Sequence, residues 1–180
     1  DFDAREDAHA SQSEKSPHQQ RSGVIVIPIE ERFEVIAPVE RVWDYFSNPS
    51  QVVPCLPGAE LLDVVDAMNY KGQVQIRVGQ ITAQYQGTVV VEKMDQQNWS
   101  MTLVARGDQK GNVGRAEARI DFSLSPLAKG GTQVVVRAEV SIAGRLAQLG
   151  SGMIQIVSKQ LFRKFVECVQ NEMQATYEGD

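Results

Sequence analysis

Histidine is almost missing from this sequence of 180 residues: His9 and His18 lie near the N-terminus, and none follows. Histidine is the commonest general base, and it completes most Ser-His and Cys-His nucleophile pairs and most zinc sites. Its absence beyond residue 18 therefore argues against these catalytic and metal sites. We predict no metal site and no enzymatic activity, because catalysis would have to depend on carboxylates, tyrosines or lysines.

Three further scarcities narrow the class of protein. Cys55 and Cys168 are the only cysteines, and without metal-ligand spacing we expect them to be reduced thiols in a cytoplasmic protein. No run reaches the ~18 to 20 apolar residues of a membrane span, and no signal peptide is visible. The formal net charge of −5 gives no support to nucleic-acid binding.

The length predicts one domain with a sizeable core. Residues 1–22 are rich in Asp, Glu, Ser, Gln and His and include one aromatic residue. Such a composition cannot bury enough apolar surface to offset the entropy of ordering. We therefore predict a disordered N-terminal leader at residues 1–22 and a single folded domain at residues 23–178.

Alternating apolar and polar residues dominate the first two thirds of the folded part. A strand is predicted up to Ile36, and a short helix follows Pro38, with apolar residues at helical spacing from Val39 to Phe46. A second short turn ends at Gly58. Further strands are predicted at residues 70–78, 81–91, 99–105, 116–124 and 134–142. Strands with one apolar face and short connections predict an antiparallel sheet with one buried side.

The longest helical pattern begins at Ala143. An apolar stripe of about thirty residues would span roughly 45 Å, enough to cross a curved sheet. The stripe consists of Leu146, Leu149, Met153, Ile154, Val157, Leu161, Phe165 and Val169. The predicted fold is α+β: a curved antiparallel sheet wrapped around a long C-terminal helix, with two short helices after the first strand.

Small residues recur on both sides of the expected sheet–helix interface. On the strands they are Gly72, Ala83, Gly87, Ala105, Ala116, Ala118 and Ala138, and the helix start adds Ala147, Gly150 and Gly152. Two interpretations stay open: the helix packs unusually close to the sheet, or a cavity remains. We favour a cavity, because an apolar pocket with few polar groups suits a lipophilic ligand. The candidate ligand-binding residues are Trp43, Phe46, Tyr85, Trp99, Met101, Ala118, Phe122, Leu146, Leu149, Gly150, Met153, Ile154 and Val157.

Four segments carry a family resemblance over roughly residues 28–172. They are A-P-V-E-R-V-W-D-Y-F-S-N-P, C-L-P-G-A-E, Y-K-G-Q-V-Q-I-R-V-G-Q-I-T-A-Q-Y-Q-G and A-G-R-L-A-Q-L-G-S-G-M-I. In this order they resemble the CoxG family of the START-like (SRPBCC) helix-grip superfamily, which is named for the G subunit of carbon monoxide dehydrogenase. The first segment is common to the superfamily, whereas the combination of the other three is far more specific.

The resemblance implies a carrier without enzymatic activity. Proteins of this family accompany molybdenum hydroxylases of the carbon monoxide dehydrogenase and xanthine oxidase type and are thought to link them to the membrane. The implied ligand is a respiratory quinone, menaquinone or ubiquinone, with no covalent cofactor. Family members often end in a membrane-binding tail, whereas this sequence stops just after the predicted helix. We therefore expect transient membrane contact, through the basic group of Lys159, Arg163 and Lys164, by a protein of the cytoplasm or the inner face of the cell membrane.

Two other functions stay open at this stage. The protein could recruit or assemble the hydroxylase without binding a ligand in the cavity. It could also be a cyclase-like or hydrolase-like enzyme of the same fold, which would need an inward-facing acid or base. Nearly every charged strand residue is predicted to face outward, which argues against the enzyme.

Overall fold

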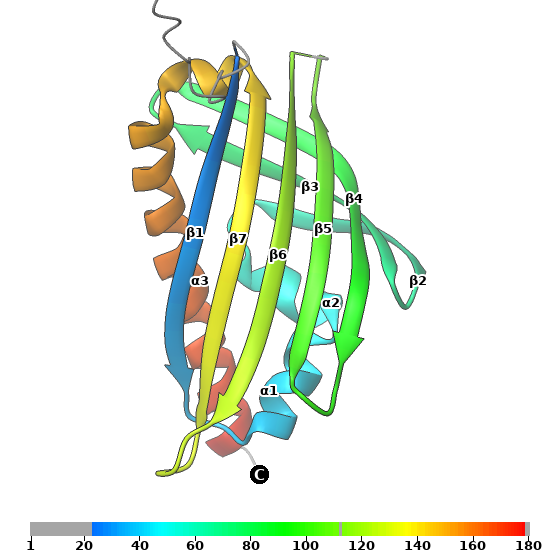
Figure 1. The fold of residues 1–180 in the computed structure, drawn as a ribbon, viewed down its shortest axis with the longest axis vertical. Helices are drawn as coiled ribbons and strands as arrows, with labels where there is room; N and C mark the ends of the chain where they lie inside the picture. The colour runs from blue at the N-terminus through cyan, green and yellow to red at the C-terminus, as the bar shows by residue number, and fades with distance from the viewer. Residues whose placement is uncertain (1–22, 112, 179–180) are drawn as a thin grey trace, which may run out of the picture.

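The structure is a computed structural model that describes residues 23–111 and 113–178, so the predicted leader at residues 1–22 lies outside it. Seven strands form one antiparallel sheet in the order β1-β7-β6-β5-β4-β3-β2 (Figure 1). The strands are β1 (Val24–Val35), β2 (Ala59–Asp66), β3 (Asn69–Val78), β4 (Ile81–Asp95), β5 (Ser100–Gln109), β6 (Gly114–Pro126) and β7 (Thr132–Gly144). The helical elements are α1 (Val39–Phe46), α2 (Pro49–Val52), η1 (Val53–Cys55), η2 (Arg145–Leu149) and α3 (Ser151–Glu178).

The short helices after β1 form where the sequence pattern predicts them. In α1 the apolar positions Val39, Val42 and Trp43 are buried. The fully buried hydroxyl of Thr132 donates a hydrogen bond of 2.8 Å to the carbonyl of Ala37, which ties β7 to the segment just before α1. Asn48 caps α2 by accepting a hydrogen bond of 3.2 Å from the backbone N–H of Ser50.

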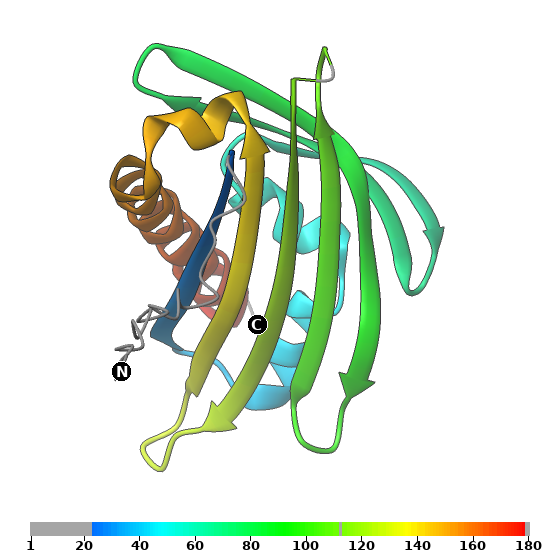
Figure 2. The same cartoon turned by 45° about the horizontal axis from the view of Figure 1, so that its top comes forward.

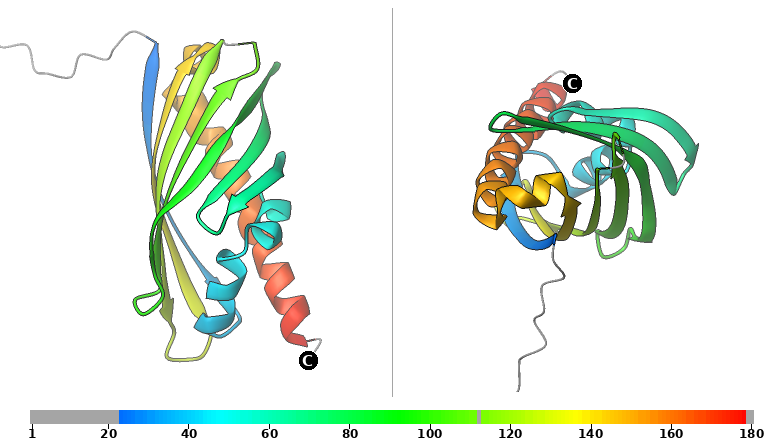
Figure 3. Two further views of the ribbon diagram at one scale, coloured as in Figure 1. Left: turned by 90° about the vertical axis from the view of Figure 1, so that its right-hand side faces the viewer. Right: turned by 90° about the horizontal axis from the view of Figure 1, so that it is seen from above.

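The sheet curls strongly, and α3 lies along its open side (Figures 2 and 3). The helix contacts β1 most extensively and also contacts β3, and these strands lie at and near opposite edges of the sheet. Helices α1 and α2 occupy one end of the grip, and η2 with the start of α3 occupies the other (Figure 1). The predicted α+β helix-grip fold is confirmed.

The start of the long helix differs from the prediction. Residues Ala143 and Gly144 still belong to β7, η2 follows, and the α-helix begins only at Ser151. Gly144 has a φ of +100° and Gly150 a φ of +85°, a backbone region that side chains other than glycine rarely adopt. Two of the glycines at this junction therefore serve the change of direction between strand, 3₁₀ turn and helix.

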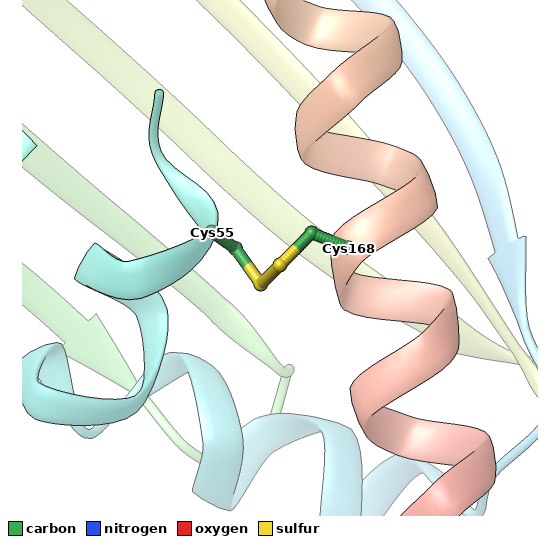
Figure 4. The surroundings of a disulfide bond; sticks show 2 residues. All are labelled: Cys55 and Cys168. Atoms are coloured by element: carbon green, nitrogen blue, oxygen red, sulfur yellow. A yellow bond between two sulfur atoms is a disulfide. The ribbon is translucent and has the colours of Figure 1, made fainter. Parts of the chain in front are cut away.

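The cysteine prediction is wrong. Cys55 of η1 and Cys168 of α3 form a disulfide, with Cα atoms 5.4 Å apart and 113 residues apart in sequence (Figure 4). The pairing arises because η1 packs against the middle of α3. Sequence separation says nothing about that proximity. The two cysteines therefore no longer support a reducing, cytoplasmic environment.

Candidate ligand-binding cavity

The inner surface of the grip carries two apolar clusters. The α1-end cluster contains five of the candidate ligand-binding residues: Trp43, Phe46, Trp99, Met101 and Phe122. Its aromatic rings are in direct contact, with centroids 5.7 Å apart between Trp43 and Trp99 and 4.4 Å apart between Phe46 and Phe122. This end of the grip is therefore filled by side chains.

The η2-end cluster contains five other candidate residues: Tyr85, Leu146, Leu149, Ile154 and Val157. They come from β4, η2 and the first turns of α3. Leu146, Tyr85 and Ile154 are each at most 5% exposed, so η2 and α3 cover the inner face of β4 here. The candidate residues are thus divided between the two ends of the grip.

A block of inward-facing residues on β5, β6 and β7 belongs to neither cluster. Ala105 pairs with Ala118, and Ile120 pairs with Ala138, so the four side chains are neighbours on the concave face. All four are only half-buried, although they lie between two buried clusters. A helix packed directly on these four side chains would cover them. Their partial exposure therefore favours a hollow over close packing in the middle of the grip.

The remaining candidate residues lie outside both clusters. Met153 is 47% exposed and faces away from the interior. Gly150 is half-buried, and a Cβ added there would meet no atom within 4 Å. Ala118 belongs to the middle block described above.

Gly72 and Gly87 were interpreted from the sequence as small residues at the interface between sheet and helix, and the structure gives a different reason for Gly87. In register, Gly72 of β3 pairs with Gly87 of β4, which pairs with Gly107 of β5. A Cβ on Gly87 would collide with the backbone oxygen of Arg106 and the Cα of Gly107. The missing side chain therefore lets two strands approach closely where the sheet bends, and the space beside it is occupied by backbone.

Two surface hollows in the described part of the chain are lined by none of the candidate residues. One of about 520 Å³ lies over β3, β4 and β5 and is lined by Gln73, Gln84, Gln86, Asp108, Gln109, Lys110 and Gly111. The other, of about 420 Å³, lies between α1, α2 and α3 and is lined by Arg41, Asp44, Tyr45, Ser50, Gln51, Pro54, Glu172 and Met173. The lining of the first is mainly polar, and that of the second combines polar and apolar surface in similar amounts, so neither matches the predicted apolar cavity.

Two buried polar groups lie side by side in register at the η2 end. Tyr85 and Gln109 pair across β4 and β5, and they are 4% and 6% exposed. Within the described residues, the Tyr85 hydroxyl and Gln109 Oε1 have no hydrogen-bond partner. Burial raises the pKa of Tyr85, so its hydroxyl keeps its proton as a donor.

Gln109 was not among the residues predicted from the sequence. The signal for it exists in the alternation: Met101, Leu103 and Ala105 face inward on β5, and the same period places Gln109 on that face. The apolar alternation of this strand ends at Ala105. The polar residues and glycines that follow it are typical of a loop, so the sequence does not predict an inward-facing strand residue at position 109.

An acid on the inner face bears on the enzyme alternative. Glu31 of β1 pairs with Val136 and lies half-buried between Ile29 and Phe33 on the inward-facing period. In residues 23–111 and 113–178, no group of three or more His, Cys, Asp or Glu side chains could hold a metal ion. One carboxylate flanked by apolar residues offers no paired acid and base.

Comparisons with known proteins agree with this architecture. The family model of the G subunit of carbon monoxide dehydrogenase (CoxG) matches residues 32–174. A conserved protein from Geobacillus kaustophilus is similar in structure with a TM-score of 0.75 and 23% identity, covering 83% of this chain and 97% of its own. No curated protein matches the sequence.

Two further solved structures share the fold alone. The ZhuI aromatase/cyclase from Streptomyces sp. R1128 has a TM-score of 0.59 at 12% identity, covering 83% of this chain and 94% of its own. Ara h 8.0201 has a TM-score of 0.53 at 13% identity, covering 83% and 99%. No helix among the described residues is long and apolar enough to cross a membrane.

Proposed function

The chain belongs to the CoxG family, that of the G subunit of carbon monoxide dehydrogenase, and from this premise we propose that it is a non-catalytic carrier of a lipophilic ligand. The ligand is a respiratory quinone, held inside the grip and passed between the membrane and a molybdenum hydroxylase of the carbon monoxide dehydrogenase type. The protein supplies the binding site and the transfer, and the partner enzyme supplies the chemistry.

The observation that carries this proposal is the half-buried block of Ala105, Ala118, Ile120 and Ala138. Three of these four inward-facing residues are alanines, and their accessible surface leaves room for an apolar molecule between the two clusters. Helix α3 meets the sheet at β1 and β3, so it bridges the open side of the curl. A preformed space of this kind suits a ligand without requiring the core to open.

The energetics set a requirement on the cavity. Removing about 300 Å² of apolar ligand surface from water is worth roughly 7 kcal/mol before ordering costs. A quinone in a bilayer is already out of water, so most of this gain cancels on extraction. The cavity must therefore be about as apolar as lipid and must add polar contacts to the head group.

The test is to identify what the protein carries. Protein purified from a quinone-producing host should show a bound mass by native mass spectrometry, and solvent extraction should release a quinone. The variant Ala118→Phe fills the middle block and should lose the bound quinone while it still unfolds cooperatively. Glu117→Phe adds the same ring at the next residue, on the outer face, and should retain it.

Two results would contradict the carrier. Wild-type protein could contain no quinone and take up none from vesicles. Alternatively, Ala118→Phe could lose roughly 1 to 3 kcal/mol of stability from overpacking with no ligand to displace. The second result would show that the middle of the grip is already full.

A second candidate function is recruitment of the hydroxylase without a ligand. The observation that favours it is the edge strand β2, where Leu62, Val64 and Val65 are 42%, 52% and 54% exposed. An exposed apolar edge strand is a common protein-docking surface. Under this alternative, Val65→Asp should abolish binding of the hydroxylase, whereas Ala118→Phe should leave both binding and electron transfer unchanged.

A further inference from the structure

Tyr85 and Gln109 form an unusual polar pair between the apolar η2-end cluster, to which Tyr85 belongs, and the polar hollow over β3, β4 and β5, which Gln109 lines. Each side chain is more than nine-tenths buried, and neither the Tyr85 hydroxyl nor Gln109 Oε1 has a partner among the described residues. Buried polar atoms in native proteins are nearly always hydrogen-bonded. Two such residues paired in register on adjacent strands indicate a site that a ligand completes.

The surroundings of the pair are apolar on the side of Tyr85. The ring belongs to the η2-end cluster, where it is buried together with Val78, Ala83, Leu146 and Ile154. On this side the walls are apolar and suit a hydrocarbon ring, whereas Gln109 borders the polar hollow over β3, β4 and β5.

The backbone is shaped around Gln109. Asp108 of β5 pairs with Arg115 of β6, so the next position on each strand brings Gln109 beside Gly114, which pairs with Gly144 of β7. A Cβ on Gly114 would come within 2.7 Å of Gln109 Oε1. The same Cβ would come within 2.6 Å of the backbone oxygen of Ala143, so the β7 backbone requires glycine at 114, and the missing side chain also leaves room for the Gln109 amide.

We propose that Tyr85 and Gln109 are the polar subsite of the grip, which binds an oxygen substituent on the ring of the carried ligand. This inference rests on the proposed function. The Tyr85 hydroxyl donates a hydrogen bond to a ring carbonyl oxygen. Gln109 Oε1 accepts one from a ring hydroxyl, so the pair serves a quinone and its reduced quinol.

The location of the subsite also orients the ligand. Ala105 lies four residues before Gln109 on β5, about 13 Å along the strand. A ring bound at the η2 end therefore directs an apolar chain toward the middle block and the α1-end cluster. The oxygen-bearing ring would lie beside Gly150 and the beginning of α3, and the chain would lie deep in the grip.

The experiment compares two probes with three variants. The probes are a 1,4-naphthoquinone with a two-isoprene side chain and the same naphthalene without its oxygens, both measured by titration calorimetry. The variants Tyr85→Phe and Gln109→Met should each weaken naphthoquinone binding about 5- to 10-fold, the loss expected for one buried hydrogen bond. Both should leave affinity for the hydrocarbon unchanged. Tyr45→Phe, which removes another buried and unpartnered hydroxyl, should change neither affinity.

The outcomes separate this inference from the function on which it rests. If Tyr85→Phe and Gln109→Met bind the naphthoquinone as tightly as wild type does, the subsite is wrong and the carrier stands. If wild type binds both probes equally, the subsite is likewise wrong. If wild type binds neither, both proposals fail. Should Gln109→Met not fold, Tyr85→Phe decides, because it only removes an unpartnered hydroxyl.

Discussion

At the scale of the residue, burial acts on two tyrosines at opposite ends of the grip. Tyr85 lies in the η2-end cluster, and Tyr45 lies in the α1-end cluster. Both hydroxyls are buried without a hydrogen-bond partner in the described structure. Burial, with a smaller contribution from the Glu172 carboxylate, raises the pKa of Tyr45 to about 12. Both tyrosines thus have a buried hydroxyl without a partner among the described residues. Tyr85 differs in that it pairs across two strands with a second buried polar residue, Gln109.

The Tyr45 pKa predicts how stability depends on alkaline pH. The unfolded chain loses the Tyr45 proton near pH 10, whereas the folded protein keeps it until about pH 12. Between these values unfolding releases a proton, so the free energy of unfolding falls as pH rises, by up to about 1.4 kcal/mol per pH unit. Tyr45→Phe removes this contribution. Urea unfolding at pH 9 and pH 11 should show wild type losing roughly 1 kcal/mol more than the variant, and equal losses would contradict the prediction.

The disulfide between Cys55 and Cys168 gives a second prediction at this scale. It closes a loop of 113 residues, and a cross-link of that length restricts the unfolded chain by about 3 to 5 kcal/mol in the loop-closure model. The Cys55→Ser/Cys168→Ser variant should lose about that much free energy of unfolding in urea. Wild type in reducing agent is the control and should match the double variant. Equal stability of oxidised and reduced wild type would contradict the prediction.

At the scale of the element, the segment from Ala143 to Gly152 decides how strand passes into helix. Gly144 closes β7, η2 makes one tight turn, and Gly150 redirects the chain into α3. Glycine occupies positions 144, 150 and 152 for different structural reasons. Gly144 lies against the backbone of Val113, Gly150 needs its positive φ, and Gly152 lies in the helix with no atom near its missing Cβ.

Because the surroundings differ, substitution of alanine for Gly144 and for Gly152 should change the stability of the protein in opposite directions. Gly144→Ala should destabilise the protein by roughly 2 kcal/mol or more, because its Cβ would collide with the Val113 carbonyl and φ is +100°. Gly152→Ala should stabilise it by up to about 1 kcal/mol through helix propensity. Thermal unfolding of both variants is the measurement. A stabilised Gly144→Ala would show that the junction is built differently.

The same segment shows where sequence patterns stop being informative. Period-two alternation predicted every β-strand except β2, and i, i+3, i+4 spacing predicted α1, because both patterns record which face is buried. The strand β2 lies at the sheet edge and is exposed over most of its length, so it carries no such pattern. The apolar stripe predicted α3 but not its first residue, since 3₁₀ and α-helical turns bury nearly the same positions. The Cys55–Cys168 pair and the partnership of Tyr85 with Gln109 depend on contacts between distant elements, so no local pattern contains them.

At the scale of the whole molecule, two of the groups of exposed apolar side chains bear on contacts with a membrane or a partner. On α3 near the η2 end, Met153 and Ile156 are 47% and 56% exposed and share one face of the helix. The exposed bases Lys159 and Arg163 follow along the same helix. The other group lies on β2, with Val64 and Val65. The first combines apolar and basic groups beside the proposed polar subsite, which suits brief contact with an anionic bilayer.

The last prediction separates these two surfaces in quinone transfer. Wild type should not co-sediment with phosphatidylcholine–phosphatidylglycerol vesicles, yet should deplete them of quinone at stoichiometric protein. Met153→Asp/Ile156→Asp should slow this transfer at least about 5-fold, because two carboxylates replace apolar contact and repel the anionic surface. Its affinity for the naphthoquinone probe in solution should be unchanged, since both side chains face away from the interior. Val64→Asp/Val65→Asp makes the same change on β2 and should transfer quinone at the wild-type rate.

Two results would contradict this prediction. Tight, salt-resistant sedimentation of wild type would indicate a fixed anchor in place of a shuttle. Equal transfer rates for the two double variants would place the entrance for the quinone on another surface.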